Sequence, residues 1–226
     1  MITGMIINWI LTIWMVLVGA WYQDEIPIFR GGQRALEAFI AEKIVYPGYS
    51  KQNCIQGTIE VAFKLTSEGR VVNTQVQKGL GIDLDDEALR IVRLTSGNWV
   101  VPRGFDTTNV MVIPISFSLT DYNCGNRTAK EIREAINNYK AQEELTGAIT
   151  NFYAKKESGS YNAGDEQKIE QLKEQLGYDD EYIDQVIKQA EQKIKQGDKE
   201  GACEDLQFIK KIGSNRADKL IEATCR

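Results

Sequence analysis

The chain has 226 residues, a formal net charge of −5 and no histidine. Basic and acidic side chains are balanced in both halves, so the positive stripe that nucleic-acid binding needs is missing. Without histidine, the commonest general base, the His-containing catalytic pairs and the His-containing metal sites are excluded, and we expect a protein that is not an enzyme and uses no metal or cofactor.

The first segment points to export. Residues 1–22 contain no charged side chain, and the run approaches the roughly 20 residues that span a bilayer. It also ends in Val18-Gly19-Ala20, which fits the small-residue rule for signal-peptide cleavage. Residues 1–20 are therefore interpreted as a signal peptide or a membrane anchor. Both alternatives place the rest in the periplasm, free or anchored to the inner membrane, where disulfides form.

Residues 24–120 are predicted to form the first folded domain. Apolar residues at helical spacing predict a helix from Ala35 that stops at Tyr46-Pro47. Alternation over residues 57–65 and 71–78, with a turn between them, predicts a hairpin. A second amphipathic helix over residues 84–95 covers it, and Val110 to Leu119 supplies a third strand. The fold class is α+β, with two helices on a three-stranded antiparallel sheet.

Several short motifs of this domain are recognisable as an ordered set. They are Tyr46-Pro47, Ile55-Gln56-Gly57, Glu68-Gly69-Arg70-Val71, Gly79-Leu80-Gly81, Leu84-Asp85-Asp86-Glu87-Ala88-Leu89-Arg90, Trp99, Pro114 and Phe117. Together they resemble the TonB C-terminal domain. The resemblance implies a periplasmic protein-binding module whose partner is an outer-membrane receptor or another envelope protein, as in energy-coupled transport.

Two features depart from the TonB pattern. Two residues, Val100 and Val101, separate Trp99 from Pro102, where the family more often has one. The long Pro- and Lys-rich linker of TonB proteins is also missing between the apolar segment and the domain, so an anchored form would not reach the outer membrane.

A binding surface is predicted at the third strand, which has no later strand to pair with. Its open edge would accept an extended peptide by strand addition, and proline at Ser116 or Ser118 should remove an N–H that this binding needs. The alternative is that the C-terminal helices or a second copy cover the edge. The predicted peptide-binding residues are Val110, Val112, Pro114, Ser116 and Ser118 and, by resemblance to TonB, Val45, Tyr46 and Pro47.

The acidic run Asp83, Asp85, Asp86 and Glu87 lacks the spacing of a calcium loop and is interpreted as capping the start of the second helix. Tyr46 and Trp99 are interpreted as core residues rather than as an exposed aromatic platform.

Residues 121–226 are predicted to be all-helical. Thr128 to Glu131 is a capping box that opens a helix, and three shorter helices are expected around residues 183–194, 202–212 and 217–221. The segment from Gly197 to Cys225 resembles a single tetratricopeptide or Sel1 hairpin.

The four cysteines are expected to form two disulfides. Gly213-Ser214 marks a helix turn almost midway between Cys203 and Cys225, so the hairpin would bring these two level. Cys54 precedes the first strand and Cys124 follows the third, so they meet if these strands are antiparallel neighbours.

Two hypotheses remain for the function. The first is a TonB-type module that binds a partner by strand addition. The second is a secreted envelope scaffold that uses the same fold for self-association, as a homodimer, or for cell-wall contact. Membrane contact is expected only through the N-terminal segment.

Overall fold

The computed structural model describes residues 26–120 and 122–225 of the chain. The predictions for residues 1–20 lie outside this part. Among the described residues, none of the helices combines the length and apolar character needed to cross a membrane.

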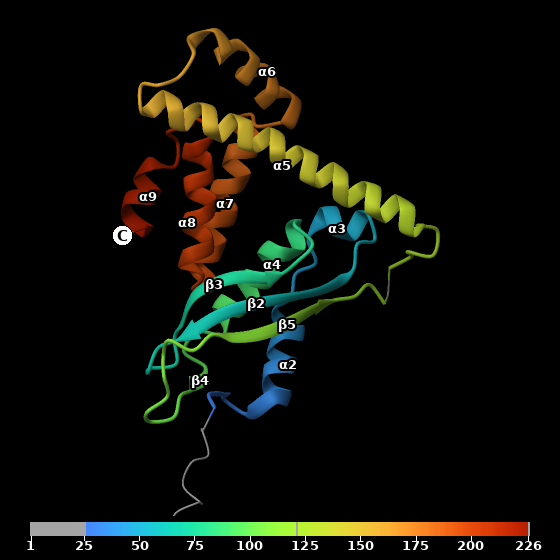
Figure 1. The fold of residues 1–226 in the computed structure, drawn as a ribbon, viewed down its shortest axis with the longest axis vertical. Helices are drawn as coiled ribbons and strands as arrows, with labels where there is room; N and C mark the ends of the chain where they lie inside the picture. Colours follow the sequence, from blue (N-terminus) through green and yellow to red (C-terminus); the bar gives the residue numbers. More distant parts are fainter. Residues whose placement is uncertain (1–25, 121, 226) are drawn as a thin grey trace, which may run out of the picture.

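The first half contains the predicted α+β fold (Figure 1). Strands β2 (Gly57–Leu65), β3 (Val71–Lys78) and β5 (Met111–Phe117) form an antiparallel sheet in the order β3-β2-β5. Helices α2 (Gly32–Lys43) and α4 (Asp83–Leu94) correspond to the two predicted helices. The sequence patterns missed the short helix α3 (Gly48–Gln52) and a two-stranded ribbon of β1 (Ile28–Phe29) and β4 (Trp99–Val100), because such short elements carry no measurable periodicity.

The core of this half lies on one face of the sheet. The alternation of β2 places Ile59, Val61, Phe63 and Leu65 on that face, all fully buried. Helix α4 packs its own apolar stripe against the same face. Each fully buried side chain of this size contributes about 1.5–3 kcal/mol by leaving water, which fixes the strand register. Trp99 belongs to this core, as predicted, with its indole N–H donating to the Thr95 hydroxyl.

The acidic residues at the start of α4 bind backbone N–H groups that lie outside the helix. Asp85 accepts from the N–H groups of Leu80 and Gly81 at 2.9 and 2.8 Å, and Asp83 accepts from the N–H of Ser50. No side chain caps the first turn of α4 itself. The prediction that these carboxylates cap the N–H groups of α4 is therefore wrong. Asp83 and Asp85 instead bind N–H groups of preceding segments and hold those segments against the helix.

The second half is helical, as predicted. It consists of α5 (Ala129–Glu157), a 3-10 turn at Ala163–Asp165, α6 (Glu166–Leu176), α7 (Asp180–Gln196), α8 (Lys199–Lys211) and α9 (Asp218–Thr224). The capping box at Thr128 is present. Helix α6 was not predicted. The apolar stripe of α5 divides: Ile132, Ala135, Ile136 and Tyr139 pack on the first core, whereas Ile149 belongs to the core between α5, α7 and α8.

Both predicted disulfides are present. Cys54 is bonded to Cys124, because β2 and β5 are antiparallel neighbours and both cysteines lie at the same end of the sheet. Cys203 is bonded to Cys225, which ties α9 to α8 across the turn at Gly213.

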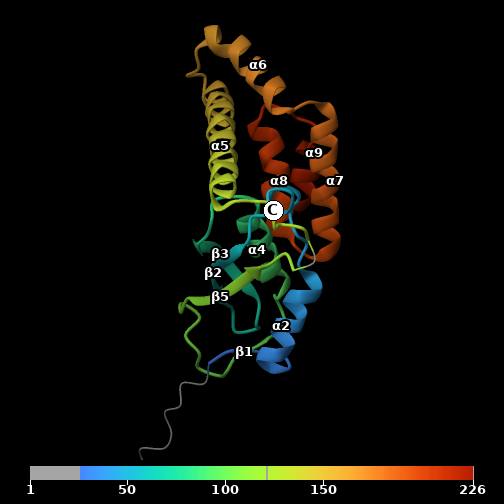
Figure 2. The same ribbon diagram turned by 90° about the vertical axis from the view of Figure 1, so that its right-hand side faces the viewer.

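The two halves meet where α5 packs on the first core and along α4. Arg93, whose side chain is only 8% exposed, donates two hydrogen bonds to Glu204 of α8 at 2.8 and 2.9 Å, and Arg90 donates one to Gln196 of α7. Lys193 of α7 pairs with Asp205 of α8, so the charged stretch from Lys188 to Lys199, whose composition alone predicts a solvated face, faces α8 on this side. Figures 1 and 2 show α7 and α8 beside α4 and β3, away from β5.

Candidate peptide-binding groove

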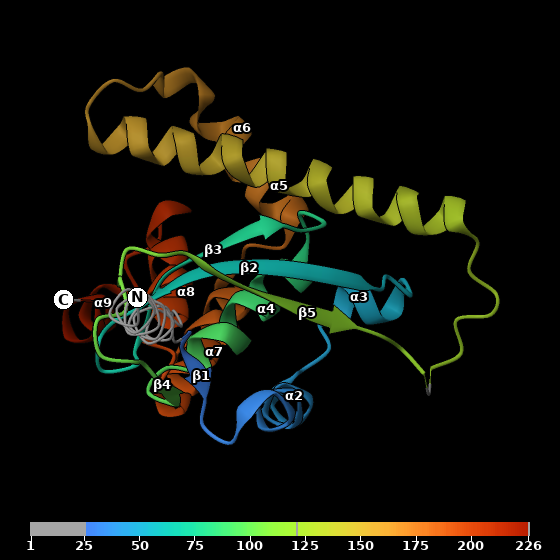
Figure 3. The same ribbon diagram turned by 60° about the horizontal axis from the view of Figure 1, so that its bottom comes forward.

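The third strand of the sheet, β5, forms one edge. It pairs only with β2 among the described strands, in a register that runs from Gly57 opposite Phe117 to Phe63 opposite Met111. Figure 3 shows β5 along the outer side of the sheet. The described C-terminal helices do not cover this edge, because α7 and α8 contact α4 and β3, and the first turns of α5 pack against α3.

The backbone of β5 alternates between its partner and the open edge. The N–H of Leu119 donates to the Gln56 side chain, on the β2 side, so the odd-numbered residues direct their N–H groups toward β2. Pro114, which has no N–H, lies at an even position, where the ladder needs no donor. Val112, Ser116 and Ser118 share this parity. The backbone N–H groups of these three residues therefore point to the open edge of the sheet, and those of Ser116 and Ser118 point in the same direction.

A groove of about 380 Å³ runs between this edge and α2. Its strand side consists of Pro114, Ser116 and Ser118, and its helix side of Glu37, Ile40, Ala41 and Ile44, with Tyr46 between them. The groove thus combines unpaired backbone groups, an apolar helix face and one carboxylate. Such a surface suits an extended peptide that adds a strand to the sheet and places alternate side chains against α2.

Tyr46 is held rigidly at the groove. Its hydroxyl donates to the carbonyl of Ile55 at 2.6 Å, and its ring meets Phe117 edge-on at 5.8 Å between centroids. Burial, with a smaller effect of the Asp83 carboxylate, raises the pKa of the Tyr46 phenol to about 12, so it remains a donor at neutral pH. The aromatic ring is therefore a fixed wall rather than a mobile side chain.

The residues before Tyr46 are fixed to α4. The N–H of Val45 donates to Glu87 at 2.7 Å, and Glu87 in turn accepts two hydrogen bonds from Arg90 at 2.7 Å. Glu87 is 8% exposed and Arg90 9%, so this ion pair is buried. This buried ion pair fixes Val45 relative to α4, and thereby the position of the next residue, Tyr46, at the groove.

Four of the eight predicted peptide-binding residues line the groove, namely Tyr46, Pro114, Ser116 and Ser118. The other four are not among the residues that line it: Val45 and Val110 are 63% and 56% exposed, Val112 lies near the start of β5 at 44% exposure, and Pro47 precedes α3. Their part in binding stays a prediction.

Sequence reasoning missed the contribution of α2 to the groove. Ile40 and Ile44 follow Leu36 at intervals of four residues and are only partly buried against the first core, so the exposed part of each side chain is left to line the groove. That pattern was visible in the sequence. The position of α2 beside the β5 edge was not, because it results from contacts between distant segments.

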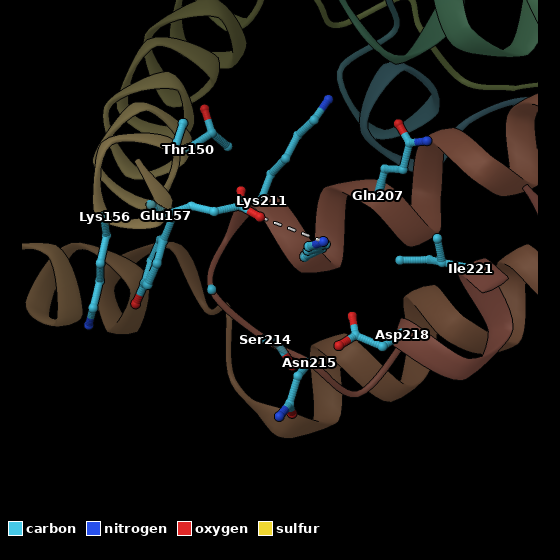
Figure 4. Close-up of a pocket in the computed structure, with 13 residues that line it drawn as sticks. Thr150, Lys156, Glu157, Gln207, Lys211, Ser214, Asn215, Asp218 and Ile221 are labelled. Carbon is cyan, nitrogen blue, oxygen red and sulfur yellow. Dashed lines mark ion pairs between the residues drawn. The ribbon is translucent and has the colours of Figure 1, made fainter. Parts of the chain in front are cut away.

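A second hollow of about 550 Å³ lies in the helical half, away from the β5 edge (Figure 4). Thr150 and Glu157 of α5, Gln207 and Lys211 of α8, and Ile221 of α9 are among its lining residues. Glu157 pairs with Lys210 across it at 3.8 Å. No sequence pattern indicated this hollow.

Among the residues that the structure describes, no group of three or more His, Cys, Asp or Glu side chains is arranged to hold a metal ion. The groove at β5 provides backbone hydrogen-bonding groups and a defined shape, which are features of a binding surface.

Comparison with known proteins supports the predicted resemblance. Residues 42–119 match the family model described as the Gram-negative bacterial TonB protein C-terminal. The matched part contains α3, α4 and the whole β3-β2-β5 sheet. A solved structure, the NMR solution structure of the Helicobacter pylori TonB C-terminal domain, is 25% identical; the match covers 39% of this chain and 94% of that one, with a TM-score of 0.32. Comparison with curated proteins gives no match.

Proposed function

We propose, from the match of residues 42–119 to the TonB C-terminal family, that the chain is an envelope protein-binding module that captures an extended segment of its partner by strand addition to β5. The observation that carries this proposal is the open edge itself. The N–H groups of Val112, Ser116 and Ser118 point away from β2, toward a groove walled by α2.

The groove indicates what kind of segment it would bind. The backbone ladder is independent of side chains, so selectivity would come from the contacts with Ile40, Ile44 and Tyr46. These contacts favour apolar side chains at alternate positions of the peptide. Glu37 adds a negative charge to the helix side, which favours a segment that is not itself acidic. By resemblance to TonB, an outer-membrane receptor or another envelope protein would supply it.

We retain the division into residues 24–120 and 121–226 as part of this proposal. The helical half would serve as a support that docks on α4 through Arg93 and leaves β5 free. Residues 1–20 would act as the signal peptide or anchor that places both domains in the periplasm.

Proline at position 116 tests strand addition. Ser116→Pro removes an N–H that faces the open edge, while the ladder to β2 uses the odd-numbered residues and stays intact. Loss of one backbone hydrogen bond of about 1 kcal/mol weakens capture about fivefold, and the ring adds a steric clash. The measurement is photo-crosslinked capture from Gram-negative envelope extract by the full chain.

Ser116→Ala is the matched control. It keeps the N–H and removes only the hydroxyl, which bonds to Thr58 at 3.0 Å on the exposed face of the sheet. We expect capture by the alanine variant to stay close to that of the parent, and circular dichroism should show both variants folded. Unchanged capture by folded Ser116→Pro and Ser118→Pro variants would rule out strand addition.

A second function is favoured by the short distance between the apolar segment and the domain. Tyr22 and Ile26 are separated by an extended span of at most about 3.5 Å per residue. A scaffold that uses the β5 edge for self-association would need no reach across the periplasm. Sedimentation of the full chain separates the two functions, since self-association through β5 gives a dimer that Ser116→Pro dissociates.

A further inference from the structure

The β1–β4 ribbon carries apolar side chains on both of its faces. Ile28 and Val100 are paired across the ribbon, and so are Phe29 and Trp99. Phe29 and Trp99 are buried at 7% and 5% exposure, whereas Ile28 and Val100 are 53% and 49% exposed. A two-stranded ribbon at the surface of a folded domain needs only one apolar face. The exposure of two apolar side chains on the outer face of the ribbon therefore requires an explanation.

The exposed apolar side chains extend beyond the pair. Ile26 lies two residues before Ile28, so extended backbone puts it on the same outer face, and it is 72% exposed while Pro27 between them is buried. We call Ile26, Ile28 and Val100 the base patch. Three adjacent branched aliphatic side chains at this exposure form a contiguous surface rather than isolated exposed residues.

Three arginines lie in chain segments next to the ribbon that carries the base patch. Arg30 directly follows β1 and donates its backbone N–H to the Asn98 carbonyl, and Arg103 follows β4 by three residues. Arg70 follows Gly69, whose carbonyl accepts the N–H of Gly97, just before β4. All three arginines are exposed. The nearby turns also carry Glu68 and Asp106, and Asp24 and Glu25 directly precede Ile26 in the sequence, so charges of both signs lie around the patch and the arginines supply the positive ones.

The position of the base patch identifies its occupant. The ribbon lies at the end of the molecule opposite α6 (Figures 1 and 2). The uncharged apolar run of residues 1–22 ends four residues before Ile26, so the base patch is within roughly 14 Å of that run along the chain. Where this run lies in a bilayer, the patch must lie close to the bilayer surface.

We propose that the base patch is a membrane-contacting surface that rests on an anionic phospholipid bilayer. Ile26, Ile28 and Val100 enter the boundary between headgroups and acyl chains, and Arg30 and Arg103 contact lipid phosphates. The domain then stands with its helical half away from the membrane, and any partner of β5 meets it at the membrane surface. This proposal rests on the ribbon and is independent of strand addition at β5.

Lipid photo-crosslinking of the full chain tests the contact. A photoreactive residue replaces Ile28 in one variant and Val100 in a second, and the chain is reconstituted into vesicles of phosphatidylethanolamine with phosphatidylglycerol. The control position is Leu145 of α5, which is 44% exposed and lies in the helical half. We expect lipid adducts at positions 28 and 100 to exceed those at 145 by about tenfold or more, because only the base patch enters the lipid boundary.

The charge requirement is tested in the same assay. Replacing phosphatidylglycerol by phosphatidylcholine, or introducing Arg30→Gln with Arg103→Gln, should lower the yield at position 28 several-fold, because the phosphate contacts are lost. Equal lipid yields at 28, 100 and 145 would overturn the proposal. Adducts at 28 and 100 that contain only a second copy of the chain or another protein would also overturn it, in favour of a protein interface.

Discussion

Replacing Asp86 by asparagine should stabilise the protein at neutral pH, by an amount that depends on pH. Asp86 lies on α4 and faces a hollow of about 320 Å³ in the seam with α7 and α8, where Lys193, Glu204 and Asp205 also lie. Burial raises the pKa of Asp86 from 3.8 to about 6; nearby Lys193 lowers it, whereas Glu204, Asp85 and Glu143 raise it further. The ionised form is therefore disfavoured in the folded protein.

The pKa shift determines the sign and the size of the effect. Because the folded pKa lies above the unfolded value, ionised Asp86 destabilises the fold above pH 6, and this cost disappears as the pH falls from about 6 to about 4. A shift of about two units at about 1.36 kcal/mol each gives at most about 3 kcal/mol, and because Asp86 remains exposed on one side, solvent screening reduces this to about 1 kcal/mol. The amide of the Asp86→Asn variant has no charge to desolvate, so we expect a gain of about 1 kcal/mol at pH 8 that disappears at about pH 4.

Urea unfolding of both proteins at pH 4, 6 and 8, with the disulfides intact, measures this difference. Asp85→Asn is the control from the same helix turn. Its carboxylate accepts two backbone N–H groups, so we expect that variant to lose about 1 kcal/mol at pH 8. A stability difference for Asp86→Asn that does not change with pH would show that the pKa of Asp86 is not raised in the folded protein.

Three further predictions concern the contacts that fix the fold. Removing the Cys54–Cys124 bridge with alanine should cost about 4 kcal/mol and removing Cys203–Cys225 about 3 kcal/mol in urea unfolding, because the bonded residues are 70 and 22 positions apart; the reverse order would contradict the loop-entropy argument. A double-mutant cycle of Arg93→Leu and Glu204→Gln should show a coupling of about 1 kcal/mol or more, and simple additivity would mean that the seam is open in solution. Glu87→Ala leaves Arg90 buried without its partner and should destabilise by about 3 kcal/mol, with faster amide exchange at Val45; a loss below about 1 kcal/mol would show that Arg90 finds water instead.

The sheet was predictable because its signals are local. The alternation of residues 57–65 and 71–78, the turn between them and the first disulfide all follow from a period of two and one antiparallel neighbour. The β1–β4 ribbon was not predictable, since two residues per strand show no period and their pairing joins segments far apart in the sequence.

The helical half shows the limits of periodicity in another way. Ile169, Leu172 and Leu176 have helical spacing, so α6 left a signal that was not used. Helix α5 carries an apolar stripe at helical spacing, but such a stripe does not identify the core that it packs on, and here it packs on two. The groove has the same origin: β5 was predicted as an open edge, whereas its wall from α2 depends on tertiary packing. The tetratricopeptide or Sel1 resemblance of the segment from Gly197 to Cys225 stays a prediction.

The most direct measurement of strand addition is residue-resolved amide hydrogen exchange along β5, with and without the partner captured from envelope extract. The odd-numbered residues from Met111 to Phe117 already donate to β2 and should exchange slowly in both states. The account predicts that Val112, Ser116 and Ser118 exchange fast alone and slowly when the partner is bound. Unchanged fast exchange at Val112 and Ser116 in the bound state would contradict it.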